Sequence, residues 1–219
     1  MRRELGLPGG GGGRRRIARP SRPPPPPSSQ VTCRSALKLV HAPTSLKLHS
    51  HPVAYGSGSG QQSVTAVPFP SDPGSLWTVW GSSSAPCAQG TPLAHGSIIR
   101  LHHESTGRWL HSHHFPSPLT RAQEVSAFGS DDVSDHLDEW AVEVVEGGAG
   151  KGGKGAPWLV DADVRLRHVE TGVFLAASPN RAYGHPIAGH HEVSGAKKAD
   201  GGCSWRAADG VYMRGRAEA

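Results

Sequence analysis

Three stretches of the chain superpose without a gap: LKLVHAPTSLKLHSH (residues 37–51), IRLHHESTGRWLHSH (99–113) and VRLRHVETGVFLAAS (164–178). Each is followed by a second shared marker, QQSVTA (61–66), AQEVSA (122–127) or HHEVSG (190–195), and then by a tryptophan. The matching positions are Leu39, Leu101 and Leu166; His41, His103 and His168; Thr44, Thr106 and Thr171; Leu48, Leu110 and Leu175; Val64, Val125 and Val193; Trp77, Trp140 and Trp205. The chain is therefore built from three copies of a unit of about 60 residues.

Within each copy the apolar residues alternate with polar ones, which is the period of a β-strand. No long segment keeps the period of a helix. One unit of this size cannot bury its apolar face alone, so the three copies must share a core. A propeller needs at least about four blades, and a solenoid needs end caps. We therefore predict an all-β chain folded as a β-trefoil, with the repeated leucines, valines and tryptophans in its core.

The predicted domain covers residues 31–215, with repeats at 31–84, 90–146 and 157–213. Residues 1–30 form a tail rich in Arg, Gly and Pro, which we expect to be disordered because it cannot bury enough apolar area to offset the entropy of ordering. The stretch GGAGKGGKG at 147–155 is expected to be a flexible loop inside the domain.

Composition narrows the class of protein. The chain has 219 residues, of which 36% are hydrophobic, with 29 Gly and 19 Pro, and this disfavours a helical bundle. No apolar run approaches the roughly 18 residues of a membrane-spanning helix, so we expect neither a transporter nor a membrane partner. The net charge of +5 belongs to residues 1–30, where seven arginines stand against Glu4 alone. Because the rest is nearly neutral, we expect no nucleic-acid partner.

The repeat resembles the MIR repeat, named for mannosyltransferases, inositol trisphosphate receptors and ryanodine receptors. Several strings are similar to those of the stromal cell-derived factor 2 family, in the same order and spacing: VTCRSALKLVH (31–41), YGSGSGQQSVT (55–65), TGRWLHSHHFPSPL (106–119) and YGHPIAGHHEV (183–193). The resemblance covers residues 31–213. It implies a β-trefoil without a catalytic role.

The resemblance also implies a function in protein quality control in the lumen of the endoplasmic reticulum. The partners it implies are a lumenal J-domain co-chaperone, the chaperone BiP and misfolded client proteins. The expected location is this lumen or, alternatively, outside the cell. No signal peptide is visible before Val31, which a mispredicted first exon would explain.

A glycan-binding module is the alternative function, because trefoils often bind sugars in repeat-related pockets and MIR repeats occur in mannosyltransferases. Candidate binding residues for a sugar or a peptide are Tyr55, Arg108 and Tyr183, since Gly-rich loops on a rigid scaffold let a ligand approach the backbone closely. The competing interpretation of the tyrosines is a ring packed under the barrel. The repeated tryptophans fall at core-like positions, which does not favour sugar binding.

The histidines concentrate in the domain, and His111 and His113 project on one face of a strand, where they form further candidate binding residues. Two such side chains can hold zinc or copper. The string H-S-H follows the shared leucine in two repeats, however, and no single repeat offers four convergent ligands. We therefore expect no metal site. A binding surface that responds to pH is a second alternative.

No complete catalytic constellation is found, so we expect neither an enzyme nor a cofactor. GAGKGGK at 148–154 nearly matches a phosphate-binding loop, but Gly155 replaces the hydroxyl residue and no βαβ unit surrounds it. The acidic residues between Asp131 and Glu139 lack the spacing of a calcium loop.

Three cysteines, Cys33, Cys87 and Cys203, leave at least one thiol unpaired. Their connectivity is left open by the sequence.

Overall fold

The strands that open the three repeats alternate half-buried and buried side chains, as the period of two predicts. They are β1 (Ala36–His41), β5 (Ile98–His103) and β10 (Asp163–His168). The computed structural model describes residues 30–146 and 150–215. In this part of the chain the helical segments are three short 3-10 turns, η2 (Pro73–Ser75), η3 (His136–Asp138) and η4 (Gly201–Cys203). The predicted all-β class is confirmed.

Each repeat contains three more main strands. They are β2 (Lys47–Ala54), β3 (Gln62–Val67) and β4 (Trp77–Gly81) in the first repeat; β6 (Arg108–Pro116), β7 (Gln123–Phe128) and β8 (Trp140–Glu146) in the second; and β11 (Phe174–Ala182), β12 (His191–Ala196) and β13 (Trp205–Val211) in the third.

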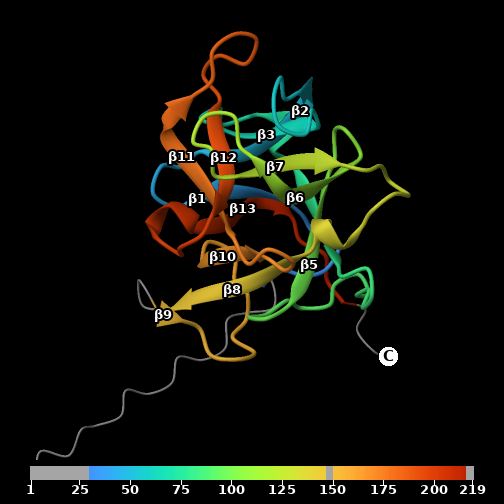
Figure 1. Ribbon diagram of the computed structural model, residues 1–219. Helices are drawn as coiled ribbons and strands as arrows, with labels where there is room; N and C mark the ends of the chain where they lie inside the picture. Colours follow the sequence, from blue (N-terminus) through green and yellow to red (C-terminus); the bar gives the residue numbers. More distant parts are fainter. Residues whose placement is uncertain (1–29, 147–149, 216–219) are drawn as a thin grey trace, which may run out of the picture.

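Six of these strands close a barrel. In ring order they are β1, β4, β5, β8, β10 and β13, each antiparallel to its neighbours. The other six form the hairpins β2–β3, β6–β7 and β11–β12. Strands β3, β7 and β12 pair with one another and so close one end, which we call the hairpin end. Figure 1 shows the hairpins above strands β5, β8 and β10. This arrangement is the predicted β-trefoil.

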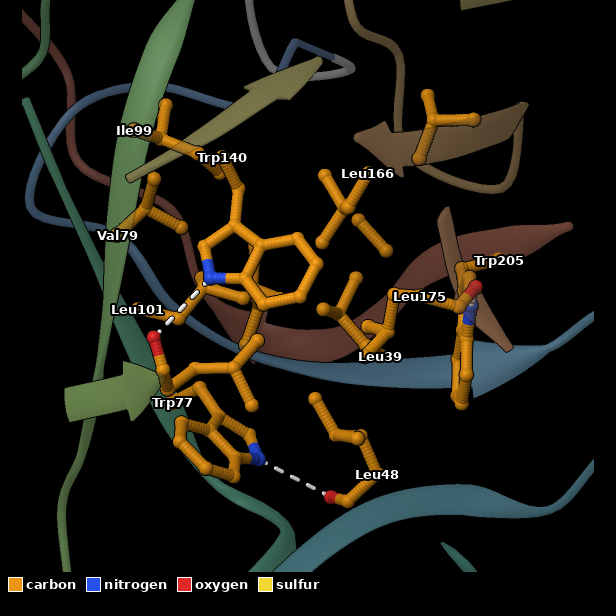
Figure 2. Close-up of a cluster of buried hydrophobic side chains, with 14 of the residues drawn as sticks. Leu39, Leu48, Trp77, Val79, Ile99, Leu101, Trp140, Leu166, Leu175 and Trp205 are labelled. Carbon is orange, nitrogen blue, oxygen red and sulfur yellow. Dashed lines mark hydrogen bonds between the residues drawn. The ribbon is translucent and has the colours of Figure 1, made fainter. Parts of the chain in front are cut away.

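The shared apolar residues fill the barrel, as the repeat predicts. The leucines, valines and tryptophans at matching positions are all fully buried. Figure 2 shows Trp77, Trp140 and Trp205 packed among Leu39, Leu101 and other aliphatic side chains. Each indole nitrogen donates a hydrogen bond to the carbonyl oxygen of the shared leucine in its own repeat, Leu48, Leu110 or Leu175, at 3.0, 3.0 and 2.9 Å. These buried polar atoms are therefore satisfied.

The shared histidine, threonine and tryptophan also make the same contacts three times, and we call these nine residues the frame. They are His41, Thr44 and Trp205; His103, Thr106 and Trp77; and His168, Thr171 and Trp140. In each set the histidine Nδ1 lies 2.7–2.9 Å from the threonine Oγ1. Its Nε2 lies 2.8–3.0 Å from the carbonyl oxygen of Gly202, Gly74 or Leu137 in a neighbouring 3-10 turn.

These contacts fix the state of the frame histidines. Because a carbonyl oxygen only accepts, Nε2 carries the hydrogen, and Nδ1 accepts from the threonine hydroxyl. Burial lowers the pKa of His41, His103 and His168, although the bond to the carbonyl opposes this shift. The frame histidines are therefore neutral packing residues.

The cysteine connectivity that the sequence leaves open is resolved. Cys33, just before β1, forms a disulfide with Cys87, in the loop after β4. Cys203 is a buried free thiol in η4. Burial raises its pKa to about 11, so the thiol is protonated and unreactive at neutral pH.

Two sequence predictions fall wholly or partly outside the described residues. The tail predicted at 1–30 lies outside the described residues, except for Gln30, which forms a bridge with Leu159. In the predicted loop 147–155, residues 147–149 lie outside the described part, and β9 (Gly150–Lys151) pairs with the end of β8. No helix in the described part of the chain is long and apolar enough to cross a membrane.

Candidate functional site at the hairpin end

The hairpin end places matching positions of the three repeats in three equivalent surroundings. The hairpins share one register, in which Ser50 faces Val64, Ser112 faces Val125 and Ala177 faces Val193. Each turn is closed by one backbone hydrogen bond, from the amide of Tyr55, Ser117 or Tyr183 to the carbonyl of Gln61, Ala122 or His190.

The last residue of a turn contacts the next repeat around the axis. His190 Nδ1 of the third hairpin lies 2.9 Å from Thr65 Oγ1, and Ser126 donates to Gln61 Oε1 of the first hairpin at 2.6 Å. Three sets of positions are therefore equivalent: His49, His51 and His190; His111, His113 and Gln61; Ala176, Ser178 and Ala122.

The first set brings three imidazole rings together, and we call it the histidine cluster. The ring centroids of His49, His51 and His190 lie 4.9–5.0 Å from one another. His49 Nε2 and His51 Nδ1 are 2.7 Å apart, while His49 Nδ1 lies 2.6 Å from Asp72 Oδ2. Gly74 permits this packing, because a Cβ there would lie 2.5 Å from the His49 ring. His49 is buried, and the other two rings are half-buried.

Burial, together with repulsion between the rings, opposes protonation of two members of the cluster. Burial, followed by repulsion from His49 and His190, lowers the pKa of His51 to about 4. Burial and repulsion from His49 also lower the pKa of His190. Burial alone would raise the pKa of Asp72, but hydrogen bonds from Ser75 and His49 outweigh it and hold the pKa below its usual value. At pH 7 Asp72 is therefore a carboxylate, and His51 and His190 are neutral.

The second set contains the sequence-predicted residues His111 and His113, each of which is bound to a carboxylate. His111 is 2% exposed, and its Nδ1 lies 2.9 Å from Asp138 Oδ1. His113 Nε2 lies 3.0 Å from Glu124 Oε1. The two rings meet edge to face with centroids 5.1 Å apart. The structure thus brings His111 and His113 together, but each is oriented by an acidic partner.

The acidic groups near His111 are already used by the backbone. His111, Asp135 and Asp138 place potential ligand atoms within 4.8 Å of one another. Asp135 accepts from the Leu137 amide, and Asp138 accepts from the Asp135 amide and the Ser134 hydroxyl, so the two carboxylates form a capping box around η3. Their arrangement is that of a helix cap.

A buried carboxylate fastens a hairpin turn to the next repeat. Glu124 is fully buried and accepts hydrogen bonds from the amide and the hydroxyl of Ser59 in the first turn. Gly58 has a φ of +70°, and a Cβ there would lie 2.0 Å from Glu124 Oε2. Glu192 accepts in the same way from the amides of Leu119 and Thr120 in the second turn. These two acids therefore stabilise loops.

The predicted binding residues Tyr55 and Tyr183 lie near each other, with ring centroids 6.4 Å apart. Tyr55 is 7% exposed, and its hydroxyl lies 2.8 Å from the Val64 carbonyl and 3.0 Å from the Val125 carbonyl. Tyr183 is half-buried at the matching position of the third turn. Both positions are those of rings that pack where the hairpins meet.

Arg108 begins β6 opposite His103 and is half-buried. Its side chain has no hydrogen bond or ion pair with another residue in the described part of the chain. The neighbouring Trp109 instead contacts the Arg100 guanidinium, which lies 4.7 Å from the indole centroid. Arg108 is therefore not brought together with the predicted tyrosines by any contact.

Sequence reasoning named none of the three histidines of the cluster as a binding residue, and it did not find their acidic neighbour Asp72. His190 belongs to a different repeat from His49 and His51, so the search for ligands within one repeat could not find it. Asp72 reaches His49 only because η2 folds back over β2. The sequence did contain a signal for His190, since HHEV at 190–193 aligns with QQSV at 61–64 and gives His190 the repeat position that Gln61 has in the first copy.

Comparison with known proteins places the chain among MIR-domain proteins. The MIR domain family matches residues 46–185. Stromal cell-derived factor 2-like protein 1 of Mus musculus is 45% identical over 184 residues, which cover 84% of this chain and 79% of that protein. Human stromal cell-derived factor 2 is also 45% identical, over 84% of this chain and 82% of that protein.

Solved structures agree with this likeness. The SDF2-like protein of Arabidopsis thaliana superposes with a TM-score of 0.79 at 39% identity, covering 86% of this chain and 99% of that one. A chain of the Saccharomyces cerevisiae protein O-mannosyltransferase Pmt1-Pmt2 complex bound to the sugar donor gives a TM-score of 0.74 at 26% identity. It covers 84% of this chain and 26% of that one. The barrel and hairpins described above are thus those of MIR-domain proteins of known structure.

Proposed function

Since the chain belongs to the stromal cell-derived factor 2 family of MIR-domain proteins, we propose that it is a noncatalytic quality-control factor of the endoplasmic reticulum lumen. In this role it acts with a lumenal J-domain co-chaperone and, through it, with BiP on misfolding-prone clients. The observation that carries the proposal is the extent of the likeness, 45% identity over 84% of the chain. The likeness thus extends over the trefoil as a whole.

The disulfide supports a lumenal location. A bond between Cys33 and Cys87 forms and persists in an oxidising compartment and is rare in the cytosol. Together with the family, it indicates the secretory pathway.

The state of the acid–base groups supports a noncatalytic role. A catalytic base needs a free position from which to reach a substrate. Glu124 is occupied by a turn and by His113, and Asp138 by the η3 cap and His111. Protonation of either acid would therefore disturb a loop, which suits a structural carboxylate.

The test is capture by the full chain, immobilised under oxidising conditions, of a purified lumenal J-domain co-chaperone and BiP in the presence of ATP. We expect the co-chaperone to bind directly, BiP to be retained only when the co-chaperone is present, and free mannose to leave both bound. A reduced and alkylated sample of the chain serves as the control for the fold.

The alternative of a glycan-binding module gives a different result when the same immobilised chain is exposed to a lumenal extract that contains the co-chaperone, BiP and glycoproteins. Retention of glycoproteins that mannose releases, with no retention of the co-chaperone, would contradict the quality-control proposal and identify a lectin.

A further inference from the structure

We propose that the histidine cluster binds one Zn²⁺ ion, with His49, His51 and His190 as its three protein ligands. The proposal rests on the geometry of the rings, on the groups that orient them and on the contrast with the two equivalent positions. It is independent of the proposed function, because the site is complete within this chain.

The spacing of the rings fits a tetrahedral ion. Zn²⁺ holds histidine nitrogens at about 2.0–2.1 Å, which puts the nitrogens about 3.3 Å from one another. In the cluster one ring nitrogen of each histidine lies within 4.8 Å of the others, and His49 Nε2 lies 2.7 Å from His51 Nδ1. Small rotations about the side-chain torsions, which move the ring nitrogens by about an ångström, bring all three nitrogens to the bonding distance.

A neighbouring group orients each ring through its other nitrogen. Asp72 Oδ2 lies 2.6 Å from His49 Nδ1, Ser63 Oγ lies 3.2 Å from His51 Nε2, and Thr65 Oγ1 lies 2.9 Å from His190 Nδ1. His49 Nε2, His51 Nδ1 and His190 Nε2 then remain as ligand atoms. Metal-binding histidines in proteins are held in this way, with the second ring nitrogen bound to a carboxylate or another polar group.

The outward contacts of His49 and His51 leave the inner nitrogens of the two rings facing each other. Ser63 donates its hydroxyl hydrogen to the Val53 carbonyl, so it accepts from His51 Nε2, which then carries hydrogen. Asp72 accepts from His49 Nδ1. The inner nitrogens, His49 Nε2 and His51 Nδ1, face each other at 2.7 Å, and a cation placed between them accepts a lone pair from each. When Zn²⁺ binds, any proton held at this position leaves to the solvent.

The coordination shell remains open on one side. His51 and His190 are half-buried, so solvent reaches the cluster and supplies a water as the fourth ligand. A site with three protein ligands and one exchangeable position is a usual coordination for Zn²⁺.

The equivalent positions show that the fold does not require the cluster. At the second equivalent position Gln61 of the first hairpin stands where the third histidine would be, and His111 and His113 are bound to Asp138 and Glu124. The third equivalent position has Ala176 and Ser178 with Ala122 of the second hairpin, and yet β11 and β12 pair in the same register. Three imidazoles therefore occur at one of three positions that the trefoil treats alike.

The test is titration of the full chain, with any purification tag removed, with ZnCl₂ followed by calorimetry. We expect one ion per chain. Co²⁺ in place of Zn²⁺ should give the visible absorption of a tetrahedral site. In His190→Gln the affinity for Zn²⁺ should fall by about tenfold or more. Folding should be unchanged, because at the equivalent position Gln61 accepts a hydrogen bond from Ser126, which matches Thr65.

Two more variants make the test decisive. His51→Ser uses the residue that the third repeat has at this position, Ser178, and should weaken binding as His190→Gln does. His114→Ala removes an exposed histidine outside the cluster and should leave the affinity unchanged. Absence of Zn²⁺ binding by the unmodified chain, or equal affinity of the unmodified chain and His190→Gln, would overturn the proposal. Equal losses in His114→Ala and His190→Gln would also overturn it, because they indicate adventitious binding to surface histidines.

Discussion

The frame and the hairpin end of this trefoil have diverged to different degrees. The frame repeats the same three residue types with the same hydrogen bonds in all three copies. The three equivalent positions at the hairpin end hold three imidazoles at the first, two imidazoles with carboxylates at the second, and small side chains at the third. The comparison teaches that a histidine in this chain is structural where the three copies agree, and that a special role should be sought where they differ.

Mutations in the frame and mutations in the histidine cluster should therefore affect different properties of the protein. The histidines and tryptophans of the frame are buried against one another at the contacts between repeats, so changes there should cost folding free energy. The cluster lies at the end of the barrel with two half-buried rings, so changes there should affect ligand binding and leave folding nearly intact.

The largest expected effect is on the frame. Trp140→Ala removes a fully buried indole, its hydrogen bond to Leu110 and its contact with His168. We expect a loss of about 3–5 kcal/mol in the free energy of unfolding, measured by urea denaturation. Phe115→Ala, at a side chain that is 48% exposed, should change it by less than about 0.5 kcal/mol. Similar losses in the two variants would contradict the division between frame and hairpin end.

Acidification should also act on the frame. Because folding lowers the pKa of His41, His103 and His168, the unfolded chain binds more protons once the pH falls below about 6.5. Stability is then fully present above this pH and declines below it, by no more than about 1.4 kcal/mol per histidine for each pH unit. Urea denaturation at pH 7.5 and 5.5, with NMR titration of the imidazole signals, measures this. Frame histidines that titrate at or above pH 6.5 would contradict the account.

A smaller effect is expected behind the histidine cluster. Asp72→Asn keeps the shape of the side chain but removes the charge that orients His49. We expect zinc affinity to fall about 10–100-fold, measured by calorimetry. Asp200→Asn is the matched control, because Asp200 begins η4 as Asp72 begins η2 and has no histidine cluster beside it. An equal loss in both variants would show that the effect is one of folding.

The smallest expected effect is a gain at the second repeat. Gln61→His supplies a third imidazole beside His111 and His113. We expect a second Zn²⁺ to bind, more weakly than the first, because Asp138 and Glu124 hold these two histidines in place. The measurement is the stoichiometry of a zinc titration. A stoichiometry that stays at one would mean that the third imidazole is not what distinguishes the two positions.

Much of the fold was predictable from the repeat. Alignment of the copies identifies the buried leucines, valines and tryptophans, because residues that must meet on a threefold axis are repeated with the fold. The pairing of Cys33 with Cys87 was not predictable, since it depends on how the loop after β4 returns to the start of β1. Strand β9 lies in a Gly-rich stretch whose composition indicates a loop.

The candidate site was predictable only in part. The sequence places His111 and His113 on one face of a strand, and the structure brings their rings together. The sequence does not indicate that Asp138 and Glu124 contact these histidines, because the contacts depend on the η3 turn and on the neighbouring strand. The histidine cluster is harder to predict from the sequence, because His190 meets His49 only where β3, β7 and β12 pair with one another.

The most direct test of the contrast between repeats is anomalous diffraction at the zinc edge from crystals of the full chain grown with one equivalent of ZnCl₂. The account predicts one strong peak at about 2 Å from ring nitrogens of His49, His51 and His190, and none of comparable height beside His111. A peak between His111 and Asp138, or no ordered peak at the histidine cluster, would contradict it.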